Sequence, residues 1–187
     1  MEPIRLYFKG ISELVGKENQ NVIILTDKEE KRQIIVVCDD WIKQQFSLRT
    51  SPVPTNDKIP EVLLTIISGW EKYRLEIHIT DIVRGQYIAS VCDVEHQKAK
   101  SISITEAILM AHIGNLPILI EPLLMHKQSA PYQKGAERLQ MPLNSLSDEM
   151  LIQALERAIE DEDYELASHL RDEQNNRKND QKNNWER

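Results

Sequence analysis

Residues 21–38 read Asn21-Val-Ile-Ile-Leu-Thr26, then Asp27-Lys-Glu-Glu-Lys-Arg32, then Gln33-Ile-Ile-Val-Val-Cys38. The first and third runs are apolar and rich in β-branched residues, and the run between them is short and charged. This pattern predicts a β-hairpin, in which two antiparallel strands are joined by a polar turn. Four consecutive β-branched residues in the third run are typical of a central strand covered on both faces.

The rest of the first 125 residues mixes strand patterns with short helix patterns. Arg84-Gly85 separates two strand patterns as a turn, and Thr105 is a candidate N-cap for the last helix, which Gly114-Asn115 ends. Such a mixture predicts an α+β domain built around a mixed β-sheet with a few helices. The strand patterns fall at 4–8, 73–83, 86–94, 100–104 and 117–120, and the helix patterns at 40–49, 61–69 and 105–115.

The C-terminal part predicts two short amphipathic helices in an antiparallel hairpin. Ser145-Leu-Ser-Asp148 resembles a capping box with Ser145 as the cap, and Asp163 is a candidate cap for the second helix. Neither helix is long enough to be stable alone, so the apolar faces must meet each other or a partner. The apolar positions are Met150, Leu151, Leu155, Ala158 and Ile159 in the first helix and Tyr164, Ala167 and Leu170 in the second.

These patterns divide the chain into four parts. We expect a globular domain at 1–125, a linker at 126–146, the helical hairpin at 147–178 and a disordered tail at 179–187. The linker is rich in turn-forming residues, and the stretch 175–184 contains no apolar residue.

Composition excludes several classes of protein. With 41% hydrophobic and 28% charged residues, the chain can bury a core, and a net charge of −7 argues against a basic nucleic-acid coat. Two cysteines, Cys38 and Cys92, are too few for a disulfide scaffold or a structural zinc site. Because no apolar run has the length of a signal peptide or a membrane span, we expect a soluble, cytoplasmic protein without membrane contact.

The segment Leu155-Glu-Arg-Ala-Ile-Glu-Asp-Glu-Asp-Tyr-Glu-Leu-Ala-Ser-His-Leu-Arg-Asp-Glu173 resembles a UVR motif. This helical hairpin occurs in two subunits of the bacterial excision-repair nuclease and in some stress-response adaptors, where it mediates protein–protein contact. The resemblance implies a protein partner. The residues that it marks for partner binding are Leu155, Ile159, Tyr164, Leu170 and Arg171.

The first 125 residues resemble the bifunctional nuclease domain family, some members of which also carry a UVR hairpin. Val22-Ile-Ile-Leu25 and Ile34-Ile-Val-Val37 stand where the family has its opening hairpin. The family's Ser-Asp-Ala helix corresponds to Thr105-Glu-Ala-Ile-Leu-Met-Ala111, and its closing strand corresponds to Pro117-Ile118. The resemblance implies activity on DNA and RNA.

The sequence departs from that family at four positions. Cys38 stands in place of a glycine, Trp41 in place of a glutamate, Ser103 in place of an arginine and Glu106 in place of an aspartate. Losing a carboxylate and an arginine from these motifs favours a protein without catalytic activity.

A metal-assisted nuclease needs two or more carboxylates around a hard cation such as Mg²⁺ or Mn²⁺. The candidates for both catalysis and metal binding are Asp39, Asp40 and Glu106. Each also has a structural explanation: Asp39-Asp40 can cap the helix that follows, and Glu106 complements the dipole of its own helix. Asp81 is a further carboxylate, and a solvated position near a hairpin end explains it most simply.

Two functions therefore remain open from the sequence. One is a metal-assisted nuclease acting on DNA or RNA. The other is a non-catalytic adaptor or scaffold, in DNA repair or stress response, that binds a protein partner through the hairpin. In either case exposed sheet edges favour a homodimer.

Overall fold

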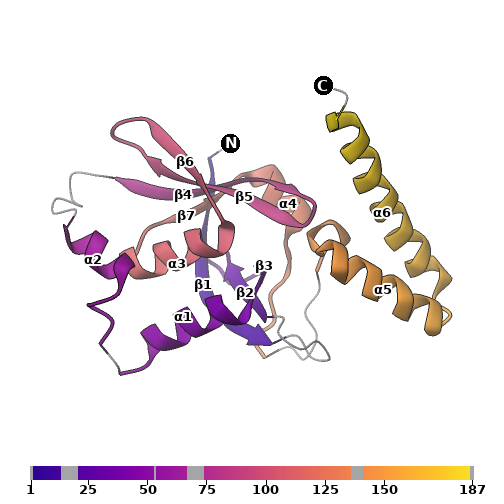
Figure 1. Ribbon diagram of the computed structural model, residues 1–187, viewed down its shortest axis with the longest axis horizontal. Helices are drawn as coiled ribbons and strands as arrows, with labels where there is room; N and C mark the ends of the chain where they lie inside the picture. Colours follow the sequence, from indigo (N-terminus) through magenta and orange to yellow (C-terminus); the bar gives the residue numbers. More distant parts are fainter. Residues whose placement is uncertain (1, 14–20, 53, 67–73, 136–140, 186–187) are drawn as a thin grey trace.

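The computed structural model describes residues 2–13, 21–52, 54–66, 74–135 and 141–185. A body containing one β-sheet and several helices is followed by a separate pair of C-terminal helices (Figure 1). This arrangement confirms the predicted α+β fold and the helical hairpin.

The body is organised around an eight-stranded sheet with the order β6-β5-β4-β7-β1-β2-β3-β8. Neighbouring strands pair antiparallel except β4 and β7, which are parallel, so the sheet is mixed as predicted. The strands are β1 (Ile4–Glu13), β2 (Asn21–Thr26), β3 (Arg32–Cys38), β4 (Leu75–Val83), β5 (Gln86–Asp93), β6 (Lys98–Ile102), β7 (Ile118–Ile120) and β8 (Ala130–Pro131).

The predicted β2–β3 hairpin forms, and its register runs from Asn21 opposite Cys38 to Thr26 opposite Gln33. Ile34 and Ile35 are neighbours in β3 and therefore point to opposite faces of the sheet. Their exposed fractions are 0% and 4%. Strand β3 is thus covered on both faces, as its unbroken apolar pattern predicts.

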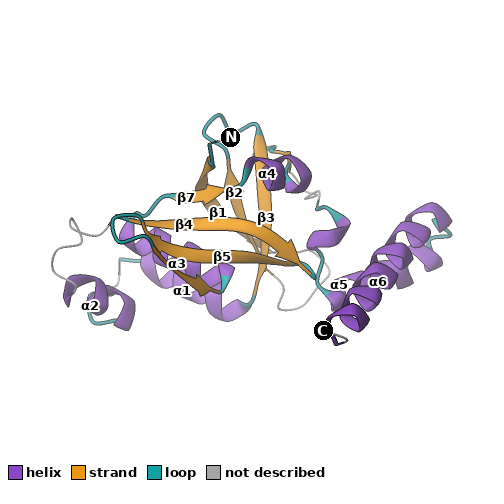
Figure 2. Ribbon diagram, turned by 90° about the horizontal axis from the view of Figure 1, so that it is seen from above, coloured by secondary structure: helices purple, strands orange, loops and turns teal. Residues whose placement is uncertain are grey.

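The helices of the body are α1 (Asp40–Thr50), α2 (Ile59–Ile66), α3 (Ile104–Gly114) and α4 (Pro122–Gln128). Figure 2 shows α1 and α3 on the same side of β4 and β5. The α3 side chains of Ala107 and Ile108 are fully buried in one apolar core with residues of β2, β3, β4 and β7. Helix α3 therefore packs in one core that extends across the sheet from β4 to β3.

The N-terminus of α3 differs from the prediction that Thr105 is its cap. The helix begins at Ile104, and Ser103 occupies the cap position without a capping hydrogen bond from its side chain. The reason is that the hydroxyls of Ser103 and Thr105 hydrogen-bond to each other at 3.0 Å. The predicted left-handed stop is confirmed, with Asn115 at φ 51°.

The body continues beyond residue 125, where we expected the linker to begin. Helix α4 runs through Gln128, and β8 pairs with the outer side of β3. The guanidinium of Arg32 donates to the hydroxyl of Ser129 at 2.7 Å. Backbone pairing with β3 and this hydrogen bond hold the segment against the body. Its low apolar content therefore gave no sign that it belongs to the body.

The expected disordered tail at 179–187 stays a prediction; the helix α6 (Tyr164–Trp185) extends into this stretch. Residues 164–185 contain neither proline nor glycine, so no residue in this polar stretch interrupts helical hydrogen bonding.

The turn between β4 and β5 touches the segment that leads into the C-terminal helices. Gly85 adopts φ +78°, and a Cβ atom placed there would lie 2.2 Å from the carbonyl oxygen of Leu146. In both views β4 ends on the side of the sheet that faces these helices (Figures 1 and 2). Only glycine allows both this turn conformation and this close approach.

We expect Gly85→Ala to lower the free energy of unfolding more than Gly135→Ala does. Gly135 has nearly the same conformation, φ +76°, and none of the described residues lies within 4 Å of an added Cβ. The left-handed conformation alone costs about 1 kcal/mol, and the clash with Leu146 adds at least about 1 kcal/mol. Urea denaturation of the two variants measures the difference. Equal losses would show that the turn does not contact Leu146 in solution.

Candidate functional site

The C-terminal hairpin consists of a 3₁₀ turn, η2 (Leu143–Ser145), and the helices α5 (Asp148–Glu160) and α6 (Tyr164–Trp185). The N-cap of α5 is Ser147, whose hydroxyl accepts a hydrogen bond from the backbone N–H of Met150 at 3.2 Å. The prediction of Ser145 as the cap is therefore wrong. Ser145 lies in η2, where its hydroxyl donates to the carbonyl of Pro142 at 2.7 Å.

The two helices reverse direction within three residues. Glu162 adopts φ +58°, and the N–H of Asp163 donates to the carbonyl of Ala158 at 2.8 Å. The Asp163 carboxylate then accepts from the N–H of Leu166 at 3.1 Å, which confirms Asp163 as the cap of α6. Acidic side chains at this helix start are stabilised by the helix dipole.

The hairpin has an apolar core of its own. Leu151 and Ala158 of α5 pack against Ala167 and Leu170 of α6, in a cluster separate from the core of the body. Side chains from the entry segment, including Leu146, pack onto this cluster. The hairpin therefore forms a unit with its own packing.

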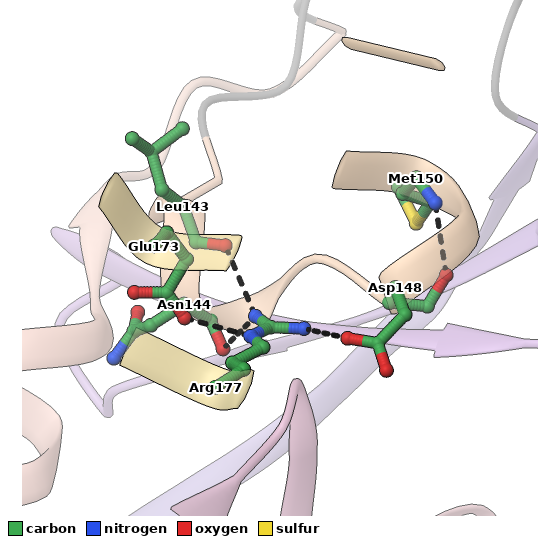
Figure 3. Close-up of polar contacts among 7 residues, drawn as sticks. Leu143, Asn144, Asp148, Met150, Glu173 and Arg177 are labelled. Carbon is green, nitrogen blue, oxygen red and sulfur yellow. Dashed lines mark hydrogen bonds and ion pairs between the residues drawn. The ribbon is translucent and has the colours of Figure 1, made fainter. Parts of the chain in front are cut away.

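A buried arginine closes the open end of the hairpin (Figure 3). Arg177 of α6 is only 6% exposed. Its guanidinium donates to the carboxylates of Asp148 and Glu173, each at 2.8 Å. It also donates to the carbonyl of Asn144 at 3.2 Å and to that of Leu143 at 3.5 Å. One side chain thus joins α6 to η2 and to the first turn of α5.

Apolar side chains remain exposed along one face of α5. Ile152 is 52% exposed and Ile159 is 46% exposed, and Leu155 between them is partly buried. Spacings of three and four residues place all three on the same face of the helix.

The matching face of α6 carries Tyr164, which is 69% exposed, and Arg171, which is exposed. These two residues are seven apart, and Gln174 follows on the same face. Gln174 lines a shallow pocket together with Ile152 of α5. We call this surface the docking face; it comprises Ile152, Leu155, Ile159, Tyr164 and Arg171.

Leu170 also stands among the predicted partner-binding residues, but the structure places it inside the hairpin. Its exposed fraction is 0%, and it packs in the core shared by the two helices. A partner would reach it only if α5 and α6 separated.

The three predicted catalytic carboxylates lie near the start of α1 and α3 in different environments. Asp39 caps α1, accepting from the N–H of Ile42 at 2.9 Å, and Asp40 accepts from the side-chain amide of Asn21 at 2.8 Å. Glu106 is half-buried in the first turn of α3. Asp39 lines a pocket that neither of the others lines.

Within the described ranges, no three His, Cys, Asp or Glu side chains are grouped so that they could hold a metal ion. The donor set around Asp39 therefore does not fit Mg²⁺ or Mn²⁺ as it stands. The catalytic and metal-binding roles of the three carboxylates stay predictions.

Comparison with known families supports the hairpin assignment. Residues 144–179 match the UVR family model, the UvrB/uvrC motif, which covers about a fifth of the chain. The match contains Arg177 together with its partners Asn144, Asp148 and Glu173. A search among curated proteins found no match, and the comparisons give no support to the resemblance of the body to bifunctional nucleases. No helix in the described part of the chain is both long and apolar enough to cross a membrane.

Sequence reasoning missed Arg177, because it belongs to the stretch 175–184, which contains no apolar residue that could mark a buried face of the hairpin. Only its spacing of four residues from Glu173 gives a local signal. Its partners near residue 144 and at Asp148 are distant in sequence and are revealed by the fold alone.

We expect Arg177→Met to destabilise the hairpin by about 2 kcal/mol, because it leaves buried carbonyls without donors and Glu173 without its ion pair. Arg171→Met is the matched control, since Arg171 lies exposed on the same helix; it should change stability by less than about 0.5 kcal/mol. Urea unfolding followed by helical circular dichroism measures both. Similar losses in the two variants would contradict the role of Arg177.

Proposed function

We propose that this protein is an adaptor whose UVR hairpin binds a protein partner through the docking face, while the body serves as a scaffold. The observation that carries this proposal is a hairpin that is capped and packed internally yet leaves Ile152, Ile159 and Tyr164 in solvent. The match to the UVR motif supports an interaction role for the same segment.

Burial of these side chains supplies a physical reason for association. Burying apolar surface contributes roughly 25 cal/mol per Å², and aromatic side chains such as Tyr164 are frequent anchors of interfaces. Ile159 and Tyr164 lie on either side of the turn, so one partner surface can cover both.

The charge around the docking face favours a protein over a nucleic acid. Glu156 is exposed between Ile152 and Ile159, and the turn from Glu160 to Asp163 is entirely acidic. Arg171 is the one cation among the five residues of the docking face, and these carboxylates outnumber it, so phosphate groups are disfavoured here. A partner with an apolar patch bordered by lysine or arginine fits this pattern, and its binding should weaken as salt rises.

We expect the double variant Ile159→Ser and Tyr164→Ala to fail to capture the proteins that the wild type captures from cell extract, because it lacks two of the exposed apolar side chains of the docking face. Ile59→Ser is the matched control, because Ile59 is 75% exposed on α2 of the body, and it should capture the same proteins as the wild type. Quantitative mass spectrometry of the captured proteins is the measurement. If the double variant retained the wild-type set, the docking face would not be the binding surface.

The second candidate is metal-assisted cleavage of DNA or RNA by the body, which follows from its resemblance to bifunctional nucleases. One observation favours it: Asp39 lies on a pocket wall together with the first residues of α3, and helix N-termini favour phosphate groups. Asp39 is the only carboxylate among the described residues that line this pocket, so the nuclease is the weaker of the two candidates.

We expect the purified protein to leave single-stranded DNA and RNA intact with Mg²⁺ or Mn²⁺, as with EDTA, because no three acidic, histidine or cysteine side chains in the described ranges are grouped to hold one ion. Electrophoresis of labelled substrates measures cleavage. Asp81→Asn is the control, because Asp81 is exposed on β4. Metal-dependent cleavage that is lost in Asp39→Asn and kept in Asp81→Asn would show that the protein is a nuclease instead.

A further inference from the structure

Exposed apolar side chains of α2 lie together at the end of the molecule away from the C-terminal hairpin (Figures 1 and 2). Ile59 is 75% exposed, Leu63 is 52% exposed and Val62 is 36% exposed. Spacings of three and four residues place these three side chains on one face of the helix, and Pro60 is exposed beside them. We call these four residues the α2 patch. Exposed apolar residues that are grouped in this way, rather than scattered singly, mark interaction surfaces.

The α2 patch carries no charge. The one charged residue of α2 is Glu61, which lies on the opposite face of the helix. It forms an ion pair with Arg49 of α1, in which the Nε and Oε1 atoms are 2.9 Å apart and the two side chains are only 6% and 15% exposed. Just before the helix, Asp57 and Lys58 form an ion pair with each other at 3.8 Å. The residues beside the patch therefore add no net charge to it.

The order of the four residues suits pairing of the patch with a second copy of itself. Ile59 and Pro60 precede Glu61, and Val62 and Leu63 follow it, so the apolar positions stay the same when the direction of the helix is reversed. A contact across a two-fold axis brings one patch against its own copy, and two antiparallel helices satisfy this symmetry. A charged patch would repel its copy in such a contact, whereas the α2 patch does not.

The two edges of the sheet offer a poorer surface for pairing two copies. At one edge β8 is only two residues long, and at the other β6 carries the exposed lysines Lys98 and Lys100. Short edge strands and edge lysines both hinder strand pairing between copies. The sheet edges, from which we expected a homodimer, therefore suit one less well than the α2 patch does.

We propose that two copies of this chain associate through the α2 patch. The two α2 helices lie antiparallel across a two-fold axis, and Ile59 of each copy packs against Leu63 of the other. Because only two short helices meet, the interface is at the small end of specific contacts, and we expect a dissociation constant of roughly 10–100 µM. The contact is apolar and uncharged, so it should not weaken as salt rises.

Such a dimer keeps both C-terminal hairpins away from the contact, since α2 and the hairpin lie at opposite ends of each copy (Figure 1). It therefore presents two docking faces, and a partner with two matching sites binds it more tightly than it binds the monomer. This consequence rests on the proposed function, whereas the pairing itself does not. A variant changed only in the α2 patch keeps its docking face and still captures the same proteins, so the two proposals fail separately.

Sedimentation equilibrium of the full chain, from about 5 to about 500 µM, tests the pairing. We expect a reversible monomer–dimer equilibrium for the wild type. Ile59→Lys and Leu63→Glu should each weaken it at least about tenfold, because each places a charge against an apolar side chain of the other copy. Leu123→Lys is the control, since Leu123 is 68% exposed on α4, and it should leave the equilibrium unchanged. A wild type that stays monomeric, whose α2 patch then serves another partner, would overturn the proposal, as would a dimer that both α2 variants retain.

Mixing Ile59→Lys with Leu63→Glu tests the antiparallel arrangement. In the mixed dimer the introduced ammonium of one chain faces the introduced carboxylate of the other, while the remaining Leu63 and Ile59 still meet. The mixture should therefore dimerise more tightly than either variant alone, and this recovery cannot come from misfolded chains. Circular dichroism of each variant checks that the helices are retained. A mixture no more dimeric than its components would refute the contact between Ile59 and Leu63.

Discussion

The guanidinium of Arg177 is the interaction on which the C-terminal hairpin depends. Two of the four buried side chains that join α5 and α6 are alanines, so apolar burial alone gives this pair of helices little stability. Arg177 adds donors to two carboxylates and two backbone carbonyls at the end away from the turn. The turn and the arginine thus hold the two ends of the hairpin, and the thin apolar core lies between them.

A hairpin held in this way can leave apolar surface in solvent without unfolding. Ile152 and Ile159 of α5 contribute little to the internal core, and Tyr164 begins α6 with most of its ring exposed. The residues that hold the hairpin together are therefore different from those that form the proposed docking face. Leu170 illustrates the division: the UVR resemblance marks it together with the exposed residues, and burial assigns it to packing.

Local patterns in the sequence predicted the elements that form through interactions between residues close together in the chain. The β-branched runs of 21–38 gave the β2–β3 hairpin, and Asp163 was correctly expected to cap α6. Interactions between distant segments were not predictable. Arg177 reaches residues some 30 positions earlier, and the Gly85 turn meets the Leu146 carbonyl only because the curved sheet brings them together. The pocket beside Asp39 could not be predicted for the same reason, because its walls come from four separate segments.

Two contacts lie at the junction between the body and the hairpin. The hydroxyl of Ser147 accepts a hydrogen bond from the first turn of α5, and the residue also lines a pocket with Gly85 of the turn between β4 and β5. Gly85 approaches the carbonyl of Leu146, one residue before that cap. Because both contacts fall within two residues of the start of α5, the way in which the hairpin leaves the sheet depends on a turn that only glycine can make.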